Sequence, residues 1–364
     1  MSSRSNAEAR GRRAVTAFLP ALRAALLCAA AVVLADALLR HESGLSGDEP
    51  FYDRMAAHPG GPHNFPYAYR VGVPWLVHVL PFSHVVSFTL LAVLAIAASG
   101  AALYVLLGEF EIRTGLATAL VVGFAVSPTL LVVLVRHGRS VDPVSVLVMI
   151  LGCLFIVRRQ RVAFAVTALI GVTVRESTLF LIPFAYAVWA ERPFDRRALR
   201  DVALTSALPI VAYVVLRTSI DAVGRQYVPG YTGPFLRARV DLVRAALSGS
   251  NLPLELRRIG LAYGPLWLVA PFALAGLAFA RRGLVLVALC VASMTFAFDW
   301  GRIIFLAAPL FFVASAWVLR DRRRLAIAAV IALFSLDVGY AIYLQVYGVK
   351  HGLDTNVGRN VPVY

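Results

Sequence analysis

The sequence predicts an all-α, polytopic membrane protein whose single domain is a bundle of about eleven transmembrane helices. The 364 residues are 60% hydrophobic and have a mean hydropathy of +0.76. Only 15% are charged, against about 25% in soluble proteins, which is too few to cover a water-exposed surface. Apolar runs of roughly 17–25 residues recur along the chain, the length of a bilayer-spanning helix. Backbone groups in lipid must be paired within a segment, and the alternating segments of a β-barrel are absent, so we expect helices.

The apolar runs define the expected spans in order. The first follows a basic stretch at Arg10, Arg12 and Arg13, and we expect it to remain as an uncleaved first span because no small-residue cleavage site follows. The short runs between 143 and 190 leave the count open by one or two. The expected spans are residues 18–39, 83–107, 115–135, 143–157, 162–175, 177–190, 201–219, 261–280, 283–298, 303–319 and 325–347.

Arginine clusters predict the orientation of this single transmembrane domain, residues 18–347. If the basic N-terminus, residues 1–17, is cytoplasmic, nearly every inner loop is a short arginine cluster, as the positive-inside rule requires. The C-terminal tail, residues 348–364, is then outside, as are the two long loops 40–82 and 220–260. The inner loops are residues 108–114, 158–161, 191–200, 281–282 and 320–324.

Composition and the absence of certain motifs also argue against several classes of function. The formal net charge is +15, carried almost wholly by arginine because Lys350 is the only lysine. No basic soluble domain with interleaved aromatic residues is present, so nucleic acid is not an expected partner. Cys28, Cys153 and Cys290 lie in apolar runs and are expected to be buried hydrophobes, not disulfide or zinc ligands. No Walker A or dinucleotide-binding motif appears, which argues against ATP- or NAD-driven chemistry.

Ionisable residues recur in several outer turns, at or just beyond the ends of spans. Such groups are costly near hydrocarbon and usually face a polar cavity or one another. We therefore predict that they share one outward-facing cavity, with solvated loop residues and helix-end ion pairs as the alternative. The turns carry Asp48, Glu49, Asp53 and Arg70; Arg136, His137, Arg139 and Asp142; Arg175 and Glu176; and Asp299 and Arg302.

This mixture of side chains suits the transfer of a group from a lipid phosphate. Guanidinium groups bind phosphate, and a carboxylate can take the proton of an attacking hydroxyl. Asp48 and Glu49 are adjacent, so we expect at most one of them to point inward, and Pro50 favours a bend there. The outer histidines show no metal-ligand spacing.

The layout of the chain resembles the GT-C superfamily, polytopic glycosyltransferases that use polyprenyl-phosphate sugars. The likeness rests on the uncleaved first span, the acidic pair Asp48-Glu49, the segment PYAYRVGVP at 66–74, the short paired spans and the Arg175-Glu176 turn. It covers residues 18–320 in layout, but only the first outer loop and the Arg-Glu turn in detail. The chain departs from the family in having no large soluble C-terminal domain and an Asp-Glu pair in place of Asp-x-Asp.

The resemblance implies a catalytic base in the first outer loop and basic residues that hold the lipid phosphate. The partners would be the lipid bilayer, a polyprenyl-phosphate-linked sugar donor and a glycan, lipid or protein acceptor of the cell envelope. The site would lie on the outer face of a bacterial plasma membrane. No cofactor is firmly predicted, and a divalent metal stays open. Carried onto this chain, the base is Asp48 or Glu49, with Asp53 nearby, and the donor-binding residues are Arg70, Arg136, Arg139, Arg175, Glu176 and Arg302.

Other classes of function remain as alternatives. A lipid or solute transporter would show inverted repeats and broken helices with polar residues at the midplane. Asp36 and Asp337 are the only acids well inside spans, and Pro128 and Pro209 do not occupy matching halves. A non-catalytic assembly protein of the envelope, or a transferase of another group such as acyl or phosphoethanolamine, completes the set.

Overall fold

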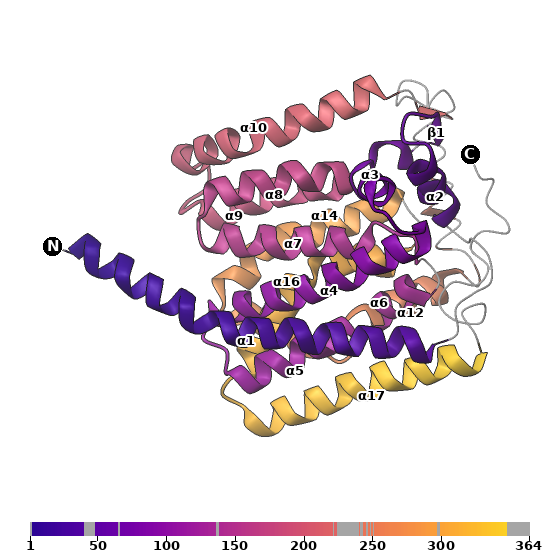
Figure 1. The fold of residues 1–364 in the computed structure, drawn as a ribbon. Helices are drawn as coiled ribbons and strands as arrows, with labels where there is room; N and C mark the ends of the chain where they lie inside the picture. The colour runs from indigo at the N-terminus through magenta and orange to yellow at the C-terminus, as the bar shows by residue number, and fades with distance from the viewer. Residues whose placement is uncertain are drawn as a thin grey trace.

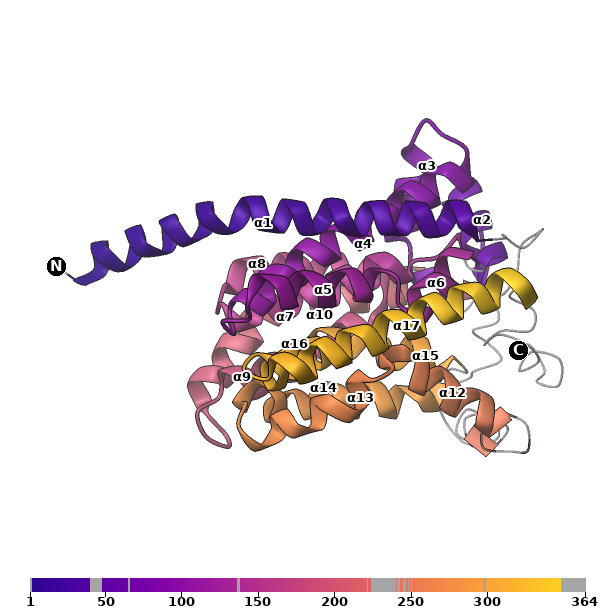
Figure 2. The same ribbon diagram turned by 90° about the horizontal axis from the view of Figure 1, so that it is seen from below.

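The protein is a bundle of helices that run roughly side by side (Figure 1, Figure 2). The computed structural model describes residues 2–39, 48–64, 66–135, 138–220, 222–223, 240, 243–244, 247, 249, 251–296 and 299–347. Within these residues the regular secondary structure is helical apart from one pair of two-residue strands. The predicted all-helical class is therefore confirmed.

The elements are as follows. The helices are α1 (Ser2–Leu38), α2 (Glu49–Ala57), α3 (Gly72–Val79), α4 (His84–Gly108), α5 (Thr114–Ala125), α6 (Pro128–Val135), α7 (Asp142–Val157), α8 (Arg161–Val174), α9 (Leu181–Trp189), α10 (Arg196–Ser219), α12 (Asn251–Tyr263), α13 (Leu266–Val269), α14 (Ala278–Ser293), α15 (Trp300–Ile304), α16 (Ala308–Leu319) and α17 (Arg323–Tyr347). The 3-10 turns are η1 (Tyr67–Tyr69), η2 (Glu176–Phe180), η5 (Ala270–Ala275), η6 (Met294–Phe296) and η7 (Phe305–Ala307), and the strands are β1 (His63–Asn64) and β2 (Ala222–Val223).

Six helical segments of the described chain are long and apolar enough to cross a membrane, and the bent pair Leu252–Tyr263 and Leu266–Ala275, with 79° between its halves, would make a seventh. Asp142–Val157 and Arg161–Val174 are shorter apolar helices. The chain thus has the helices of an integral membrane protein, while the count of eleven stays a prediction. The six are Phe18–Leu38, His84–Gly108, Thr114–Val133, Arg196–Ser219, Trp300–Leu319 and Arg323–Val346.

Small residues bring the first helices into close contact. Gly100 of α4 lies against Cys28 of α1 and Val121 of α5, so that a Cβ at this glycine would overlap the cysteine sulfur. Small residues at helix contacts allow the close approach on which packing in lipid depends. Cys28, like Cys153 and Cys290, is buried and free, as its place in an apolar run predicted.

Two of the expected loops are partly or wholly helical in the structure. Helix α12 begins at Asn251, inside the expected outer loop 220–260, and the expected inner turn 281–282 lies within α14. The chain turns instead at Gly276, where the Trp317 ring leaves no room for a side chain. Arg281 of α14 donates from Nη1 to the carbonyl of Leu274 at 3.2 Å, so this basic residue satisfies the end of η5 from inside the next helix.

Arginine-rich connections gather at one end of the bundle. Arg158, between α7 and α8, pairs with Glu109, between α4 and α5, at 2.7 Å. Arg161 at the start of α8 pairs with Asp201 of α10. Figure 1 shows the α4–α5, α9–α10 and α16–α17 connections at the end away from α2 and α3.

The described part of the expected first outer loop, 48–64 and 66–82, folds at the opposite end of the bundle. Its residues form α2, β1, η1 and α3 (Figure 1). Strand β1 pairs in parallel with β2, so that His63 lies opposite Ala222 and Asn64 opposite Val223. This short pairing joins the first and fourth of the expected outer segments, although most of the loop between 220 and 250 and the tail 348–364 lie outside the described residues.

Candidate functional site

Asp48 precedes α2 and turns its carboxylate away from that helix. Pro50, in the first turn of α2, lacks an N–H that would otherwise need a partner, and Asp48 makes no side-chain cap with its own helix. Its carboxylate instead accepts a hydrogen bond from the Tyr67 hydroxyl at 2.8 Å. Nη1 of Arg302 lies 3.3 Å from the other carboxylate oxygen. Asp48 thus joins the first outer loop to α15.

The two other acids of the first loop have different partners. Glu49 is buried and accepts a hydrogen bond from the backbone N–H of Arg139 at 3.2 Å. Asp53, one turn further along α2, lies 3.2 Å from Nδ1 of His84 and 3.4 Å from Nε of Arg139. Glu49 therefore faces the α6–α7 connection, and Asp53 faces both this connection and the start of α4.

Arg70 and Glu176 form a two-point ion pair between η1 and η2. Nε and Nη2 of Arg70 lie 3.1 Å and 2.7 Å from the two carboxylate oxygens, and Nη1 donates to the Tyr52 hydroxyl at 2.8 Å. Burial disfavours the charged carboxylate of Glu176, but the positive charge and hydrogen bonds of Arg70 outweigh this and lower its pKa to about 2. Glu176 is therefore ionised at neutral pH, and the guanidinium of Arg70 is held by protein groups on three nitrogens.

Asp142 is shared by two arginines. It begins α7, and one of its carboxylate oxygens accepts from Arg175. The other accepts from Nη1 of Arg302 at 2.9 Å, and its backbone N–H donates to Ser140 Oγ at 3.1 Å. Sequence analysis placed Asp142 in an outer turn but gave it no role, because its partners lie 33 and 160 residues away along the chain.

Arg302 contacts three acids. Asp299 caps α15 by accepting from the backbone N–H of Arg302 at 3.2 Å, as an N-cap aspartate does. The second oxygen of Asp299 lies 2.6 Å from Nε of the same residue. Since Nη1 of Arg302 also contacts Asp48 and Asp142, one guanidinium connects α15, the N-terminus of α2 and α7.

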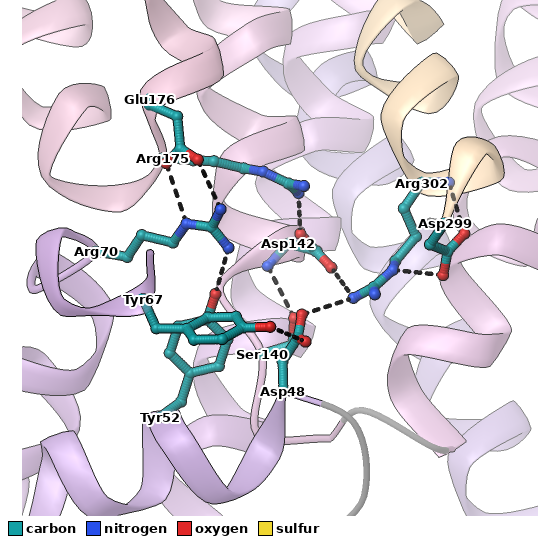
Figure 3. A network of polar contacts seen from close by, with 10 residues as sticks. All are labelled: Asp48, Tyr52, Tyr67, Arg70, Ser140, Asp142, Arg175, Glu176, Asp299 and Arg302. Carbon is teal, nitrogen blue, oxygen red and sulfur yellow. Dashed lines mark hydrogen bonds and ion pairs between the residues drawn. The ribbon is translucent and has the colours of Figure 1, made fainter. Parts of the chain in front are cut away.

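These contacts form one network at the end of the bundle that holds the first outer loop (Figure 3). We call it the outer network. It consists of Asp48, Tyr52, Tyr67, Arg70, Ser140, Asp142, Arg175, Glu176, Asp299 and Arg302. Its four acids outnumber its three arginines by one, so within the described residues each of these arginines has a carboxylate partner. An anion would bind here by sharing or displacing an existing carboxylate, which is costly for partly buried charges.

The two tyrosines of the outer network were not expected as site residues. Tyr67 stacks on Phe51 at 4.5 Å between ring centroids and meets Tyr52 edge-on at 5.6 Å. Burial, together with the negative charge of Asp48, raises the pKa of Tyr67, and burial raises that of Tyr52 to about 12. Both hydroxyls therefore stay protonated and able to donate at neutral pH. Tyr67 lies in the segment on which the family resemblance rests, which was the one available signal.

A buried ion pair of α12 supports α15 beside the outer network. Glu255 and Arg258 of α12 are paired and almost wholly buried, and Glu255 accepts from the backbone N–H of Trp300 at 3.0 Å. Gly301 lies so close to the backbone of Arg258 that a Cβ would be crowded. The pair could not be expected from the sequence, because charged residues in an expected outer loop are usually solvated.

The structure brings most of the predicted site residues together. Asp48, Arg70, Arg175, Glu176 and Arg302 belong to the outer network. Glu49, Asp53 and Arg139 lie beside it, while Arg136 is outside the described residues. Their catalytic and donor-binding roles stay predictions.

The hollow beside these site residues is not the shared cavity that the sequence predicted. A hollow of about 650 Å³ lies at the loop after α2, lined by Arg54, Ala57 and residues 58–63, and the network residues do not line it.

No group of three or more metal-ligating side chains is found in the described part of the chain. Comparison with models of known protein families and with characterised proteins gives no match.

Proposed function

We propose that this chain is a membrane glycosyltransferase that moves a sugar from a polyprenyl-phosphate donor to a glycan, lipid or protein acceptor of the cell envelope. One observation supports this most directly. Asp48 is connected through Arg302 to Asp142 and Arg175, so an acid of the first loop and arginines of two other turns form one cluster. A carboxylate beside guanidinium groups at the end of a lipid-embedded bundle suits a reaction of a lipid phosphate.

The proposed reaction needs one base and one anion-binding group. The oxygen of an acceptor hydroxyl forms a bond to the anomeric carbon of the sugar while the bond from that carbon to the phosphate oxygen breaks. The electron pair leaves with the polyprenyl phosphate, the configuration at the carbon inverts, and Asp48 takes the hydroxyl proton. Arg302, at 3.3 Å from Asp48, is placed to hold the departing phosphate next to the base.

The same proposal includes the finer topology. We propose a GT-C-like arrangement of about eleven spans, with the N-terminus inside, the C-terminus outside and the outer network on the outer face of a bacterial plasma membrane. The gathering of arginine-rich connections at the end away from α2 and α3 supports this orientation. The donor's isoprenoid tail would lie in the bilayer against the helices.

A lipid or solute transporter is the second candidate. The bent pair Leu252–Tyr263 and Leu266–Ala275 resembles a broken span, and the carboxylate of Asp337 is buried in α17. Both features occur in transporters. The transferase is preferred because the outer network lies at an end of the bundle and not at its middle.

The decisive experiment measures sugar transfer and donor binding on purified protein. The wild type is assayed against a panel of radiolabelled polyprenyl-phosphate sugars with envelope lipids and glycans as acceptors. Asp48→Asn should lower turnover by about 10²–10⁴-fold, the usual effect of removing a general base, and leave donor affinity largely intact. Asp201→Asn, a matched change in an ion pair at the far end of the bundle, should leave both unchanged.

Two outcomes would count against the proposal. Wild type that transfers none of the sugars argues against the transferase and in favour of the transporter or an assembly role. Full activity in both Asp48→Asn and Glu49→Gln would exclude the first-loop acids as the base.

A further inference from the structure

We propose that Asp142 is a positioning residue that holds Arg175 and Arg302 together and sets the charge around Asp48. The inference rests on the proposed function, because it concerns the pH at which Asp48 acts as the base. Asp142 itself would contact neither sugar nor acceptor.

The geometry assigns Asp142 this place. One carboxylate oxygen accepts from Arg175 and the other from Arg302 at 2.9 Å, so two cations from different turns converge on one acid. Without that acid, two neighbouring guanidinium groups would repel each other in a site where solvent screens little. The side chain of Asp142 is 9% exposed, and Ser140 holds its backbone N–H. The carboxylate also lies at the N-terminus of α7, where the helix dipole favours negative charge.

Asp142 and Asp48 compete for the same nitrogen. Nη1 of Arg302 lies 2.9 Å from Asp142 and 3.3 Å from Asp48. The charge of Asp142 therefore opposes ionisation of Asp48 in two ways, by repulsion and by drawing on their common cation. Arg175 counteracts this by neutralising Asp142 from the other side.

The other polar and charged groups around Asp48 and Asp142 determine how strongly a change of charge at Asp142 alters the ionisation of Asp48. Asp48 is faced by the hydroxyl groups of the first outer loop and by the residues of α15. Asp142 is faced by the three arginines of the outer network. The groups near Asp48 include Tyr52, Tyr67 and Arg302, whose guanidinium also contacts Asp142 and Asp299, and those near Asp142 include Tyr52, Arg70, Ser140, Arg175 and Arg302.

The test follows the acidic limb of the pH profile of kcat/KM, which reports ionisation of the base. Asp142→Asn removes a negative charge, so Asp48 should ionise more easily and the limb should move down by about one pH unit. Arg175→Gln removes the positive charge that neutralises Asp142, so the limb should move up. Asp201→Asn, at the far end of the bundle, should leave the limb in place. A residue that only supports the fold would lower the rate without moving the limb in opposite directions.

A second pair of variants tests the same inference if Asp142→Asn does not fold. Arg175→Lys keeps the positive charge and should leave the limb near its wild-type position, whereas Arg175→Gln should raise it. Equal limbs in these two variants, or an unmoved limb in Asp142→Asn, would overturn the inference.

Melting temperature separates this inference from the proposed function, because it needs no transfer assay. Arg175→Gln and Arg302→Gln should each lower the melting temperature of the wild type. In an Asp142→Asn background Arg175→Gln should lower it by less than half as much, because its carboxylate partner is gone, and Arg302→Gln should lower it by less than in the wild type, because the contacts with Asp48 and Asp299 remain. Equal losses in both backgrounds would show that Asp142 does not hold these arginines, even if no sugar donor is found.

Discussion

Replacing Glu176 by glutamine tests whether its ion pair with Arg70 stabilises the end of the bundle that holds α2 and α3. Pairing lowers the pKa of Glu176 from 4.5 to about 2, which corresponds to about 3 kcal/mol of differential stabilisation. A third of the side chain is exposed, so solvent screens part of this and we expect a loss of about 2 kcal/mol. At roughly 2 °C per kcal/mol for a larger domain, the melting temperature should fall by about 4 °C at pH 7.

The sign of the pH dependence is set by the same shift. Because the pKa is lower in the folded protein than in the unfolded chain, the stabilisation is complete above about pH 4.5 and is lost as the pH falls toward 2. The difference between Glu176→Gln and wild type should therefore shrink by more than half between pH 7 and pH 3.

The assay is thermal unfolding of detergent-purified protein, with Glu109→Gln as the matched control. Glu109 is 32% exposed, close to the 33% of Glu176, but its partner Arg158 is also 33% exposed, whereas Arg70 is only 10% exposed. An exposed pair contributes at most about 1 kcal/mol, so the control should shift by about 2 °C or less. The reasoning fails if the two variants lose the same stability at pH 7, or if the loss in Glu176→Gln is unchanged at pH 3.

Three further predictions follow from packing and topology. Gly301→Ala should lower the melting temperature by several degrees because its methyl group meets the backbone of α12, while Gly339→Ala, with open space around it, should not; equal melting temperatures would contradict this. Asp337→Leu should raise the melting temperature, because neither carboxylate oxygen has a hydrogen-bond partner among the described residues and an unmet buried polar group costs about 1–3 kcal/mol; a clear loss of stability would refute it. Gly60→Cys should react with an impermeant thiol reagent in intact cells, and Phe194→Cys, from the arginine-rich end, only after lysis; the reverse pattern would invert the proposed orientation.

The long helices could be predicted from hydropathy because a span in lipid must be apolar over its whole length. The expected span 83–107 corresponds to α4, and 325–347 to α17. Helix α10 starts earlier than expected, because the side chain of Asp195 caps it by accepting from Arg197 and Ala198 and draws a charged stretch into its first turn. Capping is a local contact that hydropathy does not register.

Helix α12 could not be predicted in the same way. It contains Glu255 and Arg258, whose charges lower the hydropathy of the segment. In the structure the two side chains pair with each other and are buried, so they lie on the inward face of a helix whose other face, with Leu256, is exposed. A charged residue is expected to be exposed to solvent unless a partner of opposite charge is known. Here the folded structure identifies that partner.

The charged members of the outer network were predictable, but its tyrosines and its connections were not. The recurrence of arginine and acid residues in the expected outer turns indicated that these groups would lie together, with Arg70, Arg175 and Arg302 expected to hold the donor phosphate. Which acid meets which arginine depends on how α7, α8 and α15 are placed, and no spacing along the chain encodes it. Asp142 was therefore seen as one member of a turn and not as the residue that two arginines share.

The separation of Asp48 and Arg302 along the chain also constrains how the protein is made. The two residues lie 254 positions apart, so at about 5–20 residues per second Arg302 is synthesised on the order of 10–50 s after its partner. During that interval Asp48 and Asp142 have already emerged from the ribosome without the cation that later lies between them. The nascent protein must therefore hold Asp48 without this arginine, and Asp142 with Arg175 alone, until α15 is made, so the last third of the chain completes the site.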